Sequence, residues 1–177
     1  MPHADRRHKA DARLPSYGDA VSDPLRPGPF PDDRLPEESS EAARSGIRVV
    51  IVDDHDLIRT ALRALLSCES DIEVCGDAAE GDTGATLVLD LRPDVVLMDL
   101  TMPGVGGLEA TRRIVMDWPS AKVVVLTAFA EPRLVRDALT AGARGYLLKD
   151  ADPSAVVEAV REAARGGRPM TTGIGEH

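Results

Sequence analysis

The feature that most constrains the fold is a regular alternation of short aliphatic runs and longer amphipathic segments from residue 47 onwards. The short runs are rich in Val, Ile and Leu and predict strands at residues 47–52, 72–75, 95–98, 123–126 and 145–148. After each run, apolar residues recur at helical spacing, which predicts helices near residues 57–66, 79–91, 108–115, 134–139 and 156–164. Strands that alternate with helices form a parallel sheet with helices on both faces. We therefore expect an α/β, doubly wound fold.

The two ends of the chain differ from this pattern. Residues 1–46 contain seven of the 13 prolines and only scattered apolar residues. Such a segment cannot bury enough surface to offset its chain entropy, so we expect a disordered, proline-rich N-terminal tail. Residues 167–177 contain Pro169, Gly173 and Gly175, and we expect a short flexible C-terminal tail.

Composition excludes several classes of protein. The net charge is −9, so broad electrostatic binding to nucleic acid is not expected. No apolar run reaches the length of about 18 residues that a transmembrane helix needs, and the N-terminus lacks the apolar segment of a secretory signal. The chain has only two cysteines, which favours a reduced, cytoplasmic setting.

Polar residues follow the predicted strands in a consistent way. Asp53 and Asp54 come directly after the first strand, Asp99 after the third, Thr127 after the fourth and Lys149 after the fifth. In an open parallel sheet, the residues just past the carboxyl ends of the strands lie along one edge, where ligands bind. If the strand order is 2-1-3-4-5, the first and third strands are neighbours and the three carboxylates converge.

This set of side chains is typical of phosphoryl transfer. Three adjacent carboxylates repel one another unless a cation lies among them, and oxygen ligands favour a hard ion such as Mg²⁺. Mg²⁺ commonly shares its site with a phosphate, and a carboxylate can itself be the nucleophile that forms an aspartyl phosphate. A hydroxyl and a lysine complete a site that positions and neutralises a phosphoryl group.

Four sequence motifs carry a resemblance to a known family. They are VIVDDHDLIR with Asp53 and Asp54, VVLMDLTMPG with Asp99, VVVLTAF with Thr127, and GARGYLLKD with Lys149. In this order and at this spacing, they resemble the receiver domain of two-component response regulators. The resemblance extends from residue 47 to about residue 165 and implies a receiver domain at 47–166 with a flavodoxin-like sheet.

The resemblance also implies a metal site and a phosphoacceptor. Asp99 resembles the phosphoacceptor, which receives its phosphoryl group from the phosphohistidine of a sensor histidine kinase. Asp54 resembles the direct Mg²⁺ ligand, and Asp53 the residue that holds a metal-bound water. The backbone carbonyl of Thr101 resembles a further metal ligand, and Asp99 itself also borders the metal.

Three further residues match the family's switching groups. Lys149 resembles the cation that pairs first with the acceptor carboxylate and then with the phosphate. Thr127 resembles the hydroxyl that moves onto a phosphate oxygen, and Tyr146 the aromatic residue whose rotamer follows it.

The resemblance implies a signalling switch that phosphorylates and dephosphorylates itself and is not an enzyme for free substrates. A homodimer would form through the fourth helix, fifth strand and fifth helix, or through the first and fifth helices.

Two positions bear on helix capping. Asp56 precedes an apolar helical face and is the expected N-cap of the first helix. Gly106 stands where the family usually has a polar residue, so we expect a weaker cap on the third helix.

Three alternatives remain open at this stage. The sequences of several segments, including DALTAGARGYLLKD, resemble receivers that precede a LuxR-type helix-turn-helix domain. The chain could therefore be such a transcription regulator without its output domain. This chain alone is not expected to bind DNA. A small aspartate-nucleophile phosphatase would usually carry a second Asp at position 101, which is Thr here. A flavodoxin-type nucleotide binder would need a phosphate-cradling loop where Asp53 and Asp54 lie.

Overall fold

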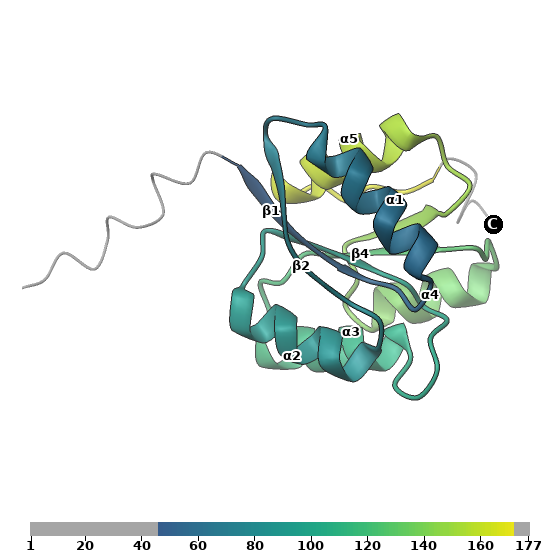
Figure 1. Ribbon diagram of the computed structural model, residues 1–177. Helices are drawn as coiled ribbons and strands as arrows, with labels where there is room; N and C mark the ends of the chain where they lie inside the picture. The colour runs from purple at the N-terminus through teal and green to yellow at the C-terminus, as the bar shows by residue number, and fades with distance from the viewer. Residues whose placement is uncertain (1–45, 172–177) are drawn as a thin grey trace, which may run out of the picture. The chain divides into compact units, whose positions relative to one another are not determined.

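A computed structural model describes residues 46–171, which form a five-stranded parallel sheet with helices on both faces (Figure 1). The strand order is β2-β1-β3-β4-β5, so the predicted doubly wound, flavodoxin-like topology is confirmed. The strands are β1 (Ile47–Val52), β2 (Ile72–Ala78), β3 (Val95–Met98), β4 (Val123–Thr127) and β5 (Gly145–Leu148). The helices are α1 (Asp56–Ser67), α2 (Gly81–Leu91), α3 (Gly107–Asp117), α4 (Pro132–Thr140) and α5 (Pro153–Ala164).

The predicted N-terminal tail, apart from Gly46, lies outside the described residues, as do residues 172–177. Within residues 46–171, none of the helices is both long enough and apolar enough to cross a membrane.

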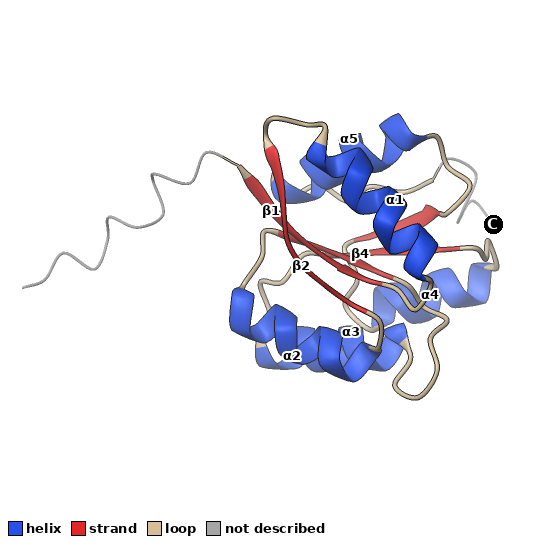
Figure 2. Cartoon of the chain, viewed as in Figure 1, coloured by secondary structure: helices blue, strands red, loops and turns tan. Residues whose placement is uncertain are grey.

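Alternating side chains of the strands supply two cores, one on each face of the sheet. In β1, Val49 and Ile51 point into a cluster with α1 and α5, whereas Val50 and Val52 point into a cluster with α2 and α3. Helices α1 and α5 therefore cover one face, and α2, α3 and α4 cover the other (Figure 2). Burial on both faces explains why β3, β4 and most of β1 are continuous aliphatic runs. In these strands, polar side chains are found at or near the strand ends.

A close approach of backbones fixes the start of α3 beneath the end of β3. A Cβ atom on Gly107 would lie 1.8 Å from the carbonyl oxygen of Asp99, so a side chain at this position would displace the backbone. The N–H of Gly107 donates to the carbonyl of Leu100 at 3.1 Å. The glycine thus lets the loop after Asp99 turn tightly into the helix.

The structure corrects two details of the predicted helices and strands and agrees with a third. The N-cap of α1 is His55, and Asp56 is the first helical residue, where it pairs with Arg59 and caps nothing.

Strand β2 extends to Ala78, beyond the predicted end at Cys75, because β1 continues to pair with it as far as Val52. Gly106 is the N-cap of α3 and supplies no side-chain hydrogen bond, as expected.

The chain after α5 runs back along the outer edge of β5. The N–H of Tyr146 donates to the carbonyl of Pro169 and the N–H of Thr171 donates to the carbonyl of Tyr146, both at 2.9 Å. The hydroxyl oxygen of Thr171 accepts from the N–H of Leu148 at 3.1 Å. A Cβ atom on Gly145 would lie 2.6 Å from the oxygen of Pro169, so a glycine makes this approach possible. Residues 169–171, which fall within the predicted C-terminal tail, therefore pack against β5.

Candidate functional site

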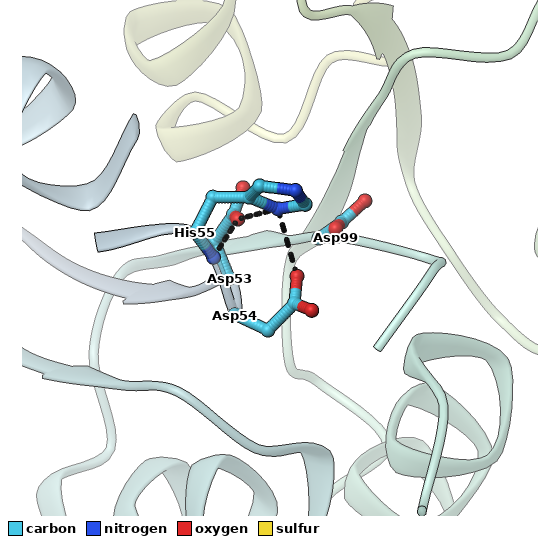
Figure 3. Close-up of side chains that lie close together, drawn as sticks. All are labelled: Asp53, Asp54, His55 and Asp99. Atoms are coloured by element: carbon cyan, nitrogen blue, oxygen red, sulfur yellow. Dashed lines mark hydrogen bonds and ion pairs between the residues drawn. The ribbon is translucent and has the colours of Figure 1, made fainter. Parts of the chain in front are cut away.

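An acidic cluster lies at the carboxyl ends of β1 and β3 (Figure 3). Asp53, Asp54, His55 and Asp99 each offer one ligand atom, and these atoms all lie within 4.8 Å of one another. Asp53 and Asp99 are buried, with 2% and 3% of their surface exposed. The neighbouring positions of β1 and β3 in the sheet bring together residues that are 45 positions apart in the sequence. The predicted convergence of the three carboxylates is therefore present.

Lys149 bridges the two buried carboxylates. Its Nζ atom lies 2.6 Å from Oδ2 of Asp53 and 3.0 Å from Oδ2 of Asp99. The residue directly follows β5, and its backbone N–H donates to the carbonyl of Thr127 in β4 at 2.7 Å. This backbone hydrogen bond holds the main chain of Lys149 next to the cluster, so its side chain starts close to the carboxylates.

The carboxyl group of Asp99 has a pKa above its ordinary value. Burial is the main cause, because it disfavours the charged form, and the charge of Asp53 adds to the rise. The ammonium of Lys149 and the backbone N–H of Thr101 act in the opposite direction. One lysine therefore compensates only in part for the burial of the Asp99 carboxylate beside a second acid.

Asp54 is more exposed than Asp53 and Asp99, and one of its carboxylate oxygens lacks a hydrogen bond within residues 46–171. Nδ1 of His55 lies 2.9 Å from Oδ1 of Asp54, but the contact lacks hydrogen-bonding geometry. Within residues 46–171, this oxygen is buried and has no hydrogen-bond partner. The oxygens of Asp53, in contrast, accept from the N–H of His55 at 2.9 Å and from Lys149. Asp54 is thus the carboxylate with coordination capacity to spare.

Thr127 and Tyr146 meet at the loop that follows β4. Thr127 is fully buried, and its hydroxyl oxygen accepts from the N–H of Phe129 at 3.4 Å. The hydroxyl of Tyr146 donates to the carbonyl of Phe129 at 2.8 Å. The tyrosine ring is also fully buried, and burial, with a smaller effect of Glu131, raises the pKa of its hydroxyl to about 12. Both side chains therefore hold the same peptide segment after β4.

The chain matches the family model of the response regulator receiver domain over residues 49–161. It belongs to the response regulator receiver family.

Named relatives and solved structures agree with this assignment. The receiver is 42% identical over 120 residues to the transcriptional regulatory protein LiaR of Bacillus subtilis, and 42% identical over 130 residues to the response regulator GacA of Pseudomonas aeruginosa. These alignments cover 68% and 73% of this chain but only 57% and 61% of the relatives, so the chain spans less than two thirds of their length.

Two solved structures show the same fold at appreciable sequence identity. One is a LuxR-family response regulator from Aurantimonas sp., with a TM-score of 0.69, 34% identity and coverage of 73% of this chain and 91% of that one. The other is the signal receiver domain of the response regulator NarL from Mycobacterium tuberculosis, with a TM-score of 0.66, 36% identity and coverage of 69% and 98%.

The receiver brings together most of the residues singled out from its sequence, and the structure adds two more. Thr101 lies in the loop after β3 and is exposed, and the role of its carbonyl stays a prediction. The sequence analysis gave no site role to His55, which contacts Asp53 and Asp54, or to Arg59, which binds the carbonyl of Asp53. The spacing of Arg59 from Asp56 indicates a helical ion pair, which was the only signal available.

Proposed function

We propose that this receiver accepts a phosphoryl group on Asp99 from the phosphohistidine of a sensor histidine kinase, with Mg²⁺ bound at the acidic cluster. The observation that carries the proposal is the pairing of the buried Asp99 carboxylate with Lys149 beside the under-coordinated oxygen of Asp54. A buried nucleophile, a fixed cation and a free carboxylate oxygen together fit phosphoryl transfer.

The donor set fits Mg²⁺. Three carboxylates supply oxygen ligands, and the buried Oδ1 atom of Asp54 lacks a hydrogen-bond partner among residues 46–171. Asp54 and Asp99 would hold the ion directly, with the carbonyl of Thr101, and Asp53 would hold a water on it. When bound, Mg²⁺ supplies positive charge that neutralises the phosphoryl oxygens.

The chain's own residues carry the transfer itself. An oxygen of Asp99 attacks phosphorus, so the phosphorus–nitrogen bond of phosphohistidine breaks as the new phosphorus–oxygen bond forms. The imidazole keeps the electron pair and takes up a proton from solvent. Lys149, already 3.0 Å from Asp99, stays beside the growing negative charge. Hydrolysis later releases phosphate and restores the carboxylate, so the chain acts on itself and not on free substrates.

The added charge would bias the surface above β4 and β5. Thr127 would turn its hydroxyl from the N–H of Phe129 towards a phosphate oxygen, and the loop that Tyr146 holds would move with it. The face formed by α4, β5 and α5, or the face formed by α1 and α5, would then bind a partner or a second copy.

A second candidate follows from the relatives. LiaR is described as a transcriptional regulatory protein, this chain spans 57% of its length, and the similar Aurantimonas structure is described as a LuxR-family response regulator, so the receiver could control a LuxR-type DNA-binding domain. In that case, the receiver keeps the same phosphorylation chemistry and does not bind DNA itself.

The test is intact-mass spectrometry after incubation with acetyl phosphate and Mg²⁺. We expect one phosphate adduct of about 80 Da that needs Mg²⁺ and is absent in Asp99→Ala. Thr101→Ala is a suitable control, since only its carbonyl is proposed to act and every residue has one. An adduct that persists in Asp99→Ala, or none on the wild type with either acetyl phosphate or phosphorylated kinases, would refute the proposal.

A further inference from the structure

Arg59 binds three segments around the acidic cluster without contacting its reacting atoms. Its Nη1 atom donates to the carbonyl of Asp53 at 2.6 Å, and its Nε atom donates to Oδ2 of Asp77 in β2 at 3.2 Å. Its Nη2 atom donates to Asp56 in the first turn of α1. Only 15% of the side chain is exposed. The guanidinium therefore connects the β1–α1 loop, the start of α1 and the end of β2.

The bond to the Asp53 carbonyl acts on the peptide that joins the two acids. A peptide unit is planar, so a fixed carbonyl oxygen fixes the plane from which the backbone of Asp54 starts. On the other side, the N–H of Asp53 donates to the carbonyl of Ala78 at 3.1 Å. The backbone of Asp53 is thus held on both sides, by Arg59 and by β2.

We propose that Arg59 is a positioning residue for the divalent cation. By fixing the peptide between Asp53 and Asp54, it keeps the carboxylate of Asp54 facing the cluster before the cation arrives. This inference rests on the proposed function, because it assigns Asp54 as a ligand. Groups that orient metal ligands in this way typically change metal affinity by about 10- to 100-fold when they are removed.

The charge of Arg59 predicts the opposite result, which makes the experiment decisive. A guanidinium near the site repels a cation, so if only its charge mattered, its removal would tighten Mg²⁺ binding. Positioning predicts weaker binding instead. Arg63 is the matched control, because it also pairs with Asp77 but has no bond to the Asp53 carbonyl.

The experiment is isothermal titration of the full chain with Mg²⁺, without a phosphodonor. We expect Arg59→Met to raise the Mg²⁺ dissociation constant by about tenfold and Arg63→Met to leave it unchanged. Arg59→Lys should lie between them, since an ammonium keeps the charge but cannot form the same fork of bonds.

Two outcomes would overturn the inference: Arg59→Met binds Mg²⁺ as tightly as the wild type or more tightly, or Arg63→Met weakens binding equally. If Arg59→Met does not fold, Arg59→Lys decides, and an unchanged dissociation constant refutes the positioning role. The titration reads the cation directly. A wild type that binds Mg²⁺ but never forms the mass adduct would therefore refute phosphorylation of Asp99 and leave this test valid.

Discussion

Asp99 and Asp71 lie at opposite ends of the sheet, and each pairs with one basic residue, yet their pKa values shift in opposite directions. Asp99 lies 3.0 Å from Lys149, and its side chain is 2% exposed. Asp71, in the loop before β2, forms two bonds with Arg161 at 2.7 and 2.9 Å, and its side chain is 46% exposed. The pKa of Asp99 is raised, chiefly by burial, whereas the pKa of Asp71 is lowered, chiefly by its hydrogen bond with Arg161.

The difference shows what a counter-ion can and cannot do. In water, a carboxylate needs little help to remain charged, so a partner lowers its pKa further. In the buried site, Lys149 must offset both the loss of solvation of Asp99 and the charge of Asp53. Its effect is smaller than theirs, so the pKa of Asp99 is raised. The buried carboxyl group at the carboxyl end of the sheet is therefore left short of positive charge, which suits a site that takes up a cation, whereas the exposed Asp71 at the amino end keeps its charge in an ion pair with Arg161.

The largest effect is expected from Lys149→Met. Removing the cation beside Asp99 should slow formation of the phosphate adduct by about 100-fold, the usual loss when one preorganised electrostatic group is removed. The rate is followed by intact mass with saturating Mg²⁺. Lys122→Met is the control from the other end of the sheet, where the lysine donates to the carbonyl of Ala164 at 2.6 Å. Equal rates of adduct formation in the two variants would contradict a special role of the carboxyl end of the sheet in the chemistry.

Gly145→Ala should lower stability without affecting the chemistry. The new Cβ atom would meet Pro169, and such overpacking costs about 1–2 kcal/mol in the free energy of unfolding. We expect faster hydrogen exchange at the N–H of Tyr146, which donates to Pro169. Urea unfolding and hydrogen-exchange mass spectrometry measure the two effects. Unchanged exchange at Tyr146 would mean that the segment after α5 does not depend on this glycine.

Asp99→Asn should stabilise the protein by about 1 kcal/mol at neutral pH without Mg²⁺, the size of an ordinary single substitution. Because the pKa of Asp99 is raised above 3.8, the stability that it contributes is present below that pH and is lost as pH rises through the folded-state pKa. Asparagine cannot ionise, so the variant avoids this loss. Urea unfolding from acidic to neutral pH should show the gain shrinking towards acid. A destabilised variant at neutral pH would refute the expected sign.

Asp71→Asn is the smallest change and should have the opposite sign. Because the pKa of Asp71 is lowered below 3.8, its contribution is present above that pH and is lost as pH falls through the folded-state pKa. We expect a slight fall in melting temperature at neutral pH that high salt removes, since exposed ion pairs are screened. Thermal unfolding in low and high salt measures it. A fall in melting temperature that persists in high salt would contradict the view that Asp71 and Arg161 form an exposed, screened ion pair.

The sequence was sufficient for the fold and for the central site because both depend on one repeated pattern. Aliphatic strands in alternation with helices dictate a parallel sheet, and the rule for strand ends then brings Asp53, Asp54 and Asp99 together. Arg59 was missed because its bond to a carbonyl depends on the path of the loop around it. Its spacing from Asp56 indicates only a surface ion pair.

The end of the ordered domain could not be predicted for a related reason. Proline and glycine near residue 169 indicate a flexible segment when only local sequence is considered. The contact that orders this segment joins Tyr146 to Met170, and no local signal identifies that partner. The start of α1 was predicted one residue late, because Asp56 is a favoured N-cap residue type but lies in the first turn of the helix, where only the backbone geometry identifies His55 as the N-cap.

The segment along β5 also determines how this sheet can meet other chains. A strand at the edge of a sheet is a template for intermolecular pairing and aggregation. Here the outer edge of β5 is already engaged by Pro169 and Thr171, and a proline offers no N–H to an incoming strand. The opposite edge belongs to β2. An intermolecular sheet grown from the folded domain would therefore start at β2, and substitutions intended to limit aggregation belong there.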